Sequence, residues 1–382
     1  MTTTITDNPI VRALYELPAP VVTAYLRAPD LGAPDDRELR LRAMLDSLHP
    51  TEATPESLRA LASVLGAVTE DRPVDPGRPA AAAFVGADGQ TRLFELPGAH
   101  LADQVHVSAV PHVLPLLEWR QSRPAYVLVL LDRTGAELVV QPAGAASAAR
   151  TEVQGPDDEI ERNAPGGWSQ PRYQNRAEDS WQHNAGRAAE AVADALSSVQ
   201  ADLLIVSGDV RAEQYFRDQL PTWIHSKVTI KEITGSRSPD GSEEHRRDRI
   251  EAAVQEYVDQ DSVQALARIR EHAGPGGLGV QGPAATIHAL ARGQVHLLVL
   301  AADEPGAEPT EPTTAWFGPQ PTDISEHRSG VLVPDGKPSH GPLKEVLARS
   351  AILTDADIRF LPAEWPDPPT LGVGALCRFT VP

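Results

Sequence analysis

Short apolar runs alternate with stretches of helical apolar spacing along almost the whole chain, which restricts it to the α/β and α+β fold classes. Near the start, residues 21–26 alternate as a strand, and residues 37–48 and 56–69 carry apolar side chains at helical spacing. Asp88-Gly89 is a hairpin turn signal between two further strands. A chain of 382 residues is expected to hold two or three domains.

The rest of the chain continues this alternation. The expected strands are 126–131, 137–140, 203–206, 227–230, 295–301, 313–317, 357–360 and 373–379. The expected helices are 172–198, 210–219, 239–272, 283–292 and 342–352, with the charged 239–272 helix broken near residue 260. A polar stretch, 144–171, precedes the first of these helices. We therefore predict three domains, 1–121, 122–262 and 263–382.

Composition excludes several classes of protein. The single cysteine, Cys377, rules out a disulfide framework and a cysteine-based zinc site. The first residues carry neither a basic start nor an apolar run. The longest apolar run, 125–131, is far shorter than the roughly 20 residues that a membrane-spanning helix needs. We therefore expect a cytoplasmic protein with no membrane partner.

The net charge constrains binding to nucleic acid. At −19, the protein should not coat nucleic acid non-specifically, because its acidic groups repel phosphates. Any contact with RNA must come from local basic patches, and DNA is not an expected partner. No G-x-G-x-x-G or G-x-x-x-x-G-K-[ST] pattern accompanies Ser207-Gly208-Asp209 at the end of its predicted strand, and no H-E-x-x-H occurs, so we expect no cofactor.

The most informative motif is the run Gly166-Gly167-Trp168-Ser169-Gln170-Pro171-Arg172-Tyr173-Gln174-Asn175-Arg176. A glycine pair lets the backbone approach RNA closely, and Gln170 can position a water or hydrogen-bond a sugar hydroxyl. Arg172 and Arg176 stand at positions i and i+4 of a predicted helix, so they can straddle phosphates. The simpler interpretation is a glycine loop before a helix, with both arginines paired to Glu178 or Asp179 at the surface.

This segment resembles the Gly-Gly-Gln loop and following helix of the archaeal and eukaryotic class-1 release factors. Arg172, Tyr173 and Arg176 match the family's residues after its loop. The hairpin before the loop and the buried strand after the helix match the family in order, as do 282–300 and 372–379 in the last third. The resemblance covers about residues 122–382. It is to the release-factor and Pelota superfamily, closest to the bacterial group of the ribosome hibernation factor Balon.

The resemblance implies an RNase H-like middle domain with a glycine loop, and a C-terminal domain similar to release-factor domain 3. It also implies a protein that occupies the vacant ribosomal A site. Its partners would be large-subunit rRNA near the peptidyl transferase centre, the small-subunit decoding region and elongation factor Tu. The implied rRNA-binding residues are Gly166, Gly167, Trp168, Ser169, Gln170, Arg172, Tyr173 and Arg176.

One departure from the family bears on its chemistry. Trp168 and Ser169 separate Gly167 from Gln170, so the glutamine lies two residues late, up to about 7 Å along an extended chain. Displacements of about 1 Å can already cost large catalytic factors. We therefore expect a hibernation factor that does not hydrolyse peptidyl-tRNA, and no enzyme. Two alternatives stay open: an active hydrolase or rescue factor that uses Gln170, and a non-ribosomal stress protein that retains the fold.

Three carboxylates suggest a further enzyme class. Asp132, Glu137 and Asp209 lie at or near the ends of predicted strands. An RNase H-like sheet can use clustered carboxylates to hold two metals, as in a nuclease. The simpler interpretation is that acids at strand ends cap turns and helices, with Asp209 at the start of helix 210–219.

Overall fold

The structure is a computed structural model of the chain. It describes residues 9–28, 36–48, 53–70, 79–132, 135–154, 170–233, 243–274, 276–302, 314–334 and 336–380. Two compact units are present. The middle unit contains Ser122–Asp259, and the two-part unit contains Thr4–Gln121 together with Gln260–Pro382. Among the described residues, no helix combines the length and apolar composition that crossing a bilayer requires.

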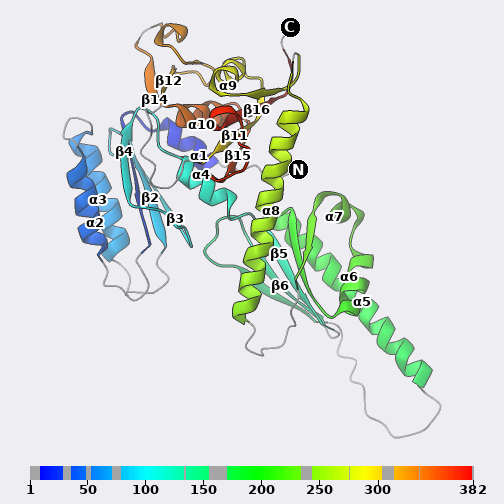
Figure 1. Ribbon diagram of the computed structural model, residues 1–382. Helices are drawn as coiled ribbons and strands as arrows, with labels where there is room; N and C mark the ends of the chain where they lie inside the picture. Colours follow the sequence, from blue (N-terminus) through cyan, green and yellow to red (C-terminus); the bar gives the residue numbers. More distant parts are fainter. Residues whose placement is uncertain are drawn as a thin grey trace. The chain divides into compact units, whose positions relative to one another are not determined.

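The middle unit is built on a five-stranded sheet in the order β7-β6-β5-β8-β9 (Figure 1). The strands are β5 (Tyr126–Leu131), β6 (Gly135–Gln141), β7 (Ala149–Gln154), β8 (Leu203–Gly208) and β9 (Thr229–Glu232). β5, β6 and β7 pair antiparallel, whereas β8 lies parallel to both β5 and β9. This mixed sheet, with its first strand β5 in the centre, is the RNase H-like arrangement that the resemblance implies.

Helices cover both faces of this sheet. α5 (Gln170–Val199) and α6 (Val210–Gln219) pack on one face, and Figure 1 shows them running side by side. The first half of α8 (Glu243–Glu271) packs on the other face through Ile250, Ala253, Val254 and Tyr257. A short helix, α7 (Thr222–Lys227), precedes β9. Because both faces are covered, β5 and β8 are almost entirely apolar, as buried strands must be.

The first part of the two-part unit is an antiparallel sheet in the order β3-β2-β1-β4. Its strands are β1 (Val21–Leu26), β2 (Ala80–Val85), β3 (Thr91–Leu96) and β4 (Gln104–Ser108). α2 (Arg37–Ser47) and α3 (Pro55–Glu70) pack on one face of it. The chain also contains α1 (Pro9–Arg12) and the 3-10 helix η1 (Ala13–Glu16) before the sheet, and α4 (Leu114–Gln121) after it.

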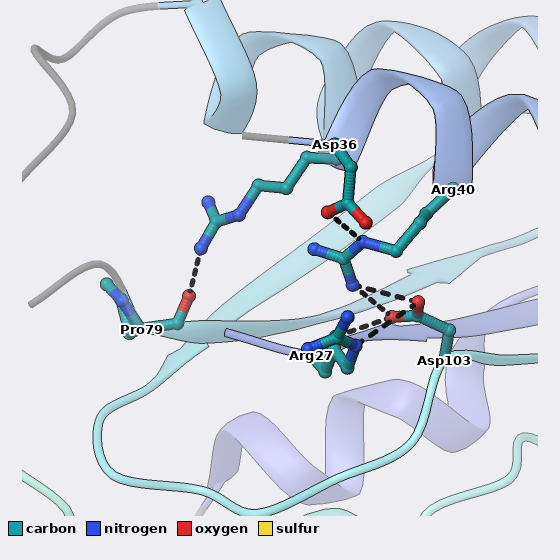
Figure 2. A network of polar contacts seen from close by, with 6 residues as sticks. Arg27, Asp36, Arg40, Pro79 and Asp103 are labelled. Atoms are coloured by element: carbon teal, nitrogen blue, oxygen red, sulfur yellow. Dashed lines mark hydrogen bonds and ion pairs between the residues drawn. The ribbon is translucent and has the colours of Figure 1, made fainter. Parts of the chain in front are cut away.

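A network of polar contacts joins α2 to the end of this sheet (Figure 2). Arg40 donates to Asp36 at 2.7 Å and to both carboxylate oxygens of Asp103 at 2.8 and 2.9 Å. The backbone N–H of Arg27 also donates to Asp103, at 2.8 Å. Arg37 is buried and donates to the carbonyl of Pro79 at 2.9 Å. Asp36 and Asp103 thus pair with Arg40 and Arg27, and Arg37 is held by a backbone carbonyl, so the network is structural.

The second part of the two-part unit holds two sheets. One has the order β10-β16-β11-β15, and the other the order β13-β12-β14. The strands are β10 (Gly279–Gln281), β11 (Val295–Ala301), β12 (Thr314–Phe317), β13 (Ile324–Ser325), β14 (Ser339–Pro342), β15 (Asp357–Leu361) and β16 (Val373–Cys377). The helices are the second half of α8, α9 (Pro283–Leu290), α10 (Leu343–Leu353) and the 3-10 turns η2 (Arg328–Gly330) and η3 (Thr370–Gly372). Cys377 is a buried free thiol.

The two parts share one hydrophobic core, and α10 lies within it. Glu345 of α10 is 1% exposed, and its carboxylate accepts the backbone N–H groups of Val113 and Leu114 at 3.0 and 3.2 Å. His112 Nδ1 lies 2.6 Å from the same carboxylate. Glu345 therefore caps the start of α4, where a negative charge is stabilised by unpaired N–H groups.

The predicted elements are largely confirmed, with three corrections. The expected break of the 239–272 helix near residue 260 is wrong, because α8 is continuous from Glu243 to Glu271. The strand expected at 227–230 begins at Thr229, because Lys227 ends α7. The polar stretch 144–171 contains β7, which pairs with β6 at the edge of the sheet.

Candidate functional site

The predicted rRNA-binding residues fall at the start of α5. This helix begins at Gln170, so the glutamine is its first residue, and Arg172, Tyr173 and Arg176 belong to its first two turns. Gly166, Gly167, Trp168 and Ser169 lie outside the described residues, as do the side chains of Gln170, Arg172, Tyr173 and Arg176. The assignment of these residues to RNA binding therefore stays a prediction.

The second half of α5 shows how this helix is held. Its buried residues recur at helical spacing and pack against the sheet and α6; they are Ala185, Ala188, Ala189, Val192 and Leu196. All five stand on one face at positions i, i+3, i+4, i+7 and i+11, the spacing from which the sequence predicts a buried helix side. Small side chains let the helix approach the sheet closely. The packed half therefore anchors the half that carries the predicted residues.

The three carboxylates considered for metal binding have separate structural roles. Asp209 accepts the N–H of Arg211 at 3.0 Å and caps α6, as the simpler interpretation predicts. Asp132 accepts the N–H of Gly135 at 2.9 Å in the hairpin turn. Glu137 pairs with Arg150 across the β6–β7 ladder at 3.1 Å. Within the described ranges, no three His, Cys, Asp or Glu side chains gather to hold a metal, so the nuclease gains no support.

A close contact joins the carboxyl ends of β5 and β8. A Cβ atom on Gly208 would stand 2.4 Å from the carbonyl oxygen of Leu131, so only glycine fits there. Beside this contact lies a hollow of about 20 Å³ between the ends of these strands, α5 and α6. Its lining includes Asp132, Asn184 and Arg211. A hollow of this size accommodates a water but not a small-molecule substrate.

A short basic run, Arg246, Arg247 and Arg249, lies near the start of α8. Arg247 and Arg249 are exposed near the beginning of this helix. The apolar side of the same stretch packs on the sheet through Ile250 and Ala253. This is the arrangement of a solvated helix face.

Sequence reasoning missed the buried Glu345 and its contacts with 112–114. The signal was weak, because Lys344 and Arg349 also stand in 343–353, and an acidic residue in such a mixed stretch is equally compatible with an exposed helix face. Its partners are more than 230 positions away along the chain, at separations of 232 and 231 residues. Local patterns do not contain such a contact.

A comparison with protein families supports the resemblance seen in the sequence. Residues 125–275 match the family described as bacterial archaeo-eukaryotic release factor family 2. Two proteins of Mycobacterium tuberculosis, Rv2629 of strain H37Rv and MT2704 of strain CDC 1551, are each 25% identical over 273 residues. Those alignments cover 71% of this chain and 71% of each relative.

Solved structures of low sequence identity are also similar. Ribosome-bound archaeal Pelota has a TM-score of 0.41 at 11% identity, covering 100% of this chain and 96% of that one. Dom34 of Saccharomyces cerevisiae, a translation termination-like factor that interacts with Hbs1, has a TM-score of 0.40 at 10% identity, covering 82% of each chain.

Proposed function

We propose that the protein binds the ribosome and acts as a hibernation factor, because residues 125–275 match the bacterial archaeo-eukaryotic release factor family 2. It would occupy the vacant A site, with 166–176 approaching large-subunit RNA near the peptidyl transferase centre. Another part of the chain would reach the small-subunit decoding region. The observation that carries this proposal is that the family match contains the glycine pair, Gln170 and all of α5.

The spacing of the motif supports a role without hydrolysis. Gln170 is the first residue of α5, and Trp168 and Ser169 separate it from Gly167. A helix rises only about 1.5 Å per residue and holds its backbone rigidly. The position of Gln170 is thus fixed by the helix, and two residues separate it from the glycine pair. Catalysis that depends on a glutamine directly after the glycine pair would lose its geometry.

Binding to ribosomes is the primary test. The purified protein should sediment with vacant ribosomes despite its net charge of −19, and an A-site ligand should displace it. Binding should weaken as salt rises, because phosphate contacts release counterions. If the protein stays in the supernatant at low salt, the proposal is wrong, and the alternative of a non-ribosomal stress protein is favoured.

A peptide-release assay distinguishes a hibernation factor that only occupies the A site from an active peptidyl-tRNA hydrolase. Peptidyl-tRNA on stalled ribosomes should stay intact after the protein is added, over the time in which an active release factor empties the same ribosomes. The matched variant is Gln170→Ala, which should behave like the parent protein. Rapid release of peptide by the parent, and its loss in the variant, would establish the hydrolase instead.

Contact with elongation factor Tu is a separate part of the proposal. The full-length protein should retain this factor when vacant ribosomes are present, and the complex should be recovered in the ribosomal pellet. The control is the same mixture without the protein. If the amount of factor in the pellet is equal in both, this contact is excluded while ribosome binding is unaffected.

A further inference from the structure

The outer face of the small sheet β13-β12-β14 carries an aromatic side chain that lies outside the core. Along β12, Ala315 and Phe317 are buried in the core of the two-part unit, whereas Trp316 points to the opposite face, because successive residues of a strand alternate. Trp119 and Trp365 pack against hydrophobic clusters, but Trp316 belongs to none of the clusters formed by the described residues. Packing of the core therefore does not explain this indole.

Two further planar groups lie beside Trp316. His340 is directly opposite it in the β12–β14 register, and the two ring centres are 5.0 Å apart at an angle of 36°. The guanidinium of Arg328, which follows β13 in η2, lies 5.8 Å from the centre of the indole ring. His340 and Arg328 are exposed, and Trp316 is partly exposed. Together these three flat side chains form a stacking row across the open face of the sheet.

We propose that this stacking row binds an unpaired base of ribosomal RNA. Single-stranded bases stack on aromatic rings and on arginine planes, and the open face of a sheet is a common support for such rings. A guanidinium also binds phosphate, so Arg328 would hold the phosphate beside the stacked base. The inference rests on the proposed function, and it adds a contact made by the last third of the chain.

The charges near the row favour an anionic partner. Within the described residues Arg328 makes no ion pair. Of the two acids that flank β13, Asp323 accepts the N–H of Gln320 at 2.9 Å in the preceding turn, and Glu326 is exposed. The described strand positions of this face include no acid; they are Thr314, Trp316, Ser325, His340 and Pro342. In a chain with 53 acidic residues, such a face repels RNA less than most of the surface does.

The test compares affinities for vacant ribosomes, measured by sedimentation over a range of salt concentrations. The full-length parent protein is compared with Trp316→Ala, Trp316→Phe, His340→Ala and Glu326→Gln. Trp223→Ala is the matched control, because Trp223 is an exposed indole of α7 in the middle unit. A further variant carries a photoreactive diazirine amino acid in place of Thr314, an exposed residue of the same sheet face, to capture the molecule that lies there.

Stacking on one base corresponds to a change in affinity of about 5- to 150-fold. We expect Trp316→Ala to weaken binding by a factor in this range, with little change in the salt slope, because a ring stack involves no charge. His340→Ala should weaken binding too, and Trp316→Phe should lose less than Trp316→Ala. Glu326→Gln should bind more tightly, because it removes a charge that repels phosphate. Trp223→Ala should bind like the parent, and the diazirine should capture ribosomal RNA.

Melting temperatures separate an effect on binding from an effect on folding. If Trp316→Ala melts lower than the parent, His340→Ala decides the test, because that ring is exposed. Parental affinity in both variants, or capture of a ribosomal protein without RNA, would show that the inference is wrong while the proposed function stands. If the parent protein does not bind vacant ribosomes, the proposed function fails and the inference fails with it.

Discussion

α5 and α10 both carry charged side chains beside apolar ones, but they place them in opposite environments. In α10, Glu345 and Arg349 are 1% and 9% exposed, and both are held by groups from elsewhere in the two-part unit. Arg349 donates to the carbonyl of Pro319 at 3.0 Å and lies over the ring of Phe317. In α5, Arg187 is exposed. Buried charged side chains thus help to specify packing, whereas an exposed one does not.

Removing the buried charge of α10 should have the largest effect on stability. Glu345→Ala leaves the N–H groups of Val113 and Leu114 without their acceptor and removes the partner of His112. We expect a loss of about 3–5 kcal/mol in the free energy of unfolding. Denaturant titration of the full chain measures this loss.

Glu345→Gln is the matched variant, because it keeps one acceptor oxygen and a similar volume. Its loss should be clearly smaller than that of Glu345→Ala. Equal losses in both variants, or a loss below about 1 kcal/mol in Glu345→Ala, would show that this carboxylate does not hold α4 and α10 together.

The next effect concerns backbone packing in the middle unit. Gly208→Ala places a methyl group 2.4 Å from the carbonyl oxygen of Leu131, which is backbone and cannot rotate away. We expect a loss of about 1–3 kcal/mol, measured as a lower melting temperature. The control is Gly66→Ala in α3, where nothing lies within 4 Å. That change should stabilise the protein by about 0.5–1 kcal/mol, because alanine favours a helix over glycine.

A smaller effect is expected from one buried hydroxyl. Tyr25 donates to the carbonyl of His112 at 2.7 Å and accepts the N–H of Leu116 at 3.3 Å. Burial, with Glu345 nearby, raises the pKa of Tyr25 well above its ordinary value, so the phenol stays protonated and can donate. Tyr25→Phe should cost about 1–2 kcal/mol of unfolding free energy. A variant as stable as the parent would mean that water replaces both bonds.

The smallest effect on stability should come from the start of α5. Replacing Arg172 and Arg176 together by Ala should change the unfolding free energy by less than about 0.5 kcal/mol. The salt slope of ribosome binding should fall by an amount near one to two phosphate charges. Trp168→Ala should instead weaken binding with little change in slope, because stacking on a base is worth about 1–3 kcal/mol and involves no charge. Unchanged affinity in both variants would remove this segment from the site.

Much of the secondary structure was predictable because it depends on local periodicity. The buried strands Leu203–Gly208 and Val295–Ala301 are apolar runs of the right length, and α6 follows an acidic cap. The missed strands have weak local patterns. β14, with the sequence Ser-His-Gly-Pro, contains no large apolar side chain and is a strand only because β12 pairs with it.

The continuity of α8 shows another limit of local patterns. In its first half, Ile250 and Val254 pack in the middle unit, whereas Leu266 and Ile269 pack in the two-part unit. The apolar stripe therefore moves to another side of the helix, and the sequence suggests a break. The backbone continues because each half is buried by a different set of strands.

The sequence by itself determined the α/β class, most strands and helices, and the motif by which this chain resembles the release-factor superfamily. These features arise from spacings of two to eleven residues, which a single segment contains. Only the tertiary structure decided that the first and last parts of the chain share one core, with Glu345 capping a helix more than 200 residues earlier. Such a contact depends on which surfaces meet after the elements have formed, and no local spacing records it.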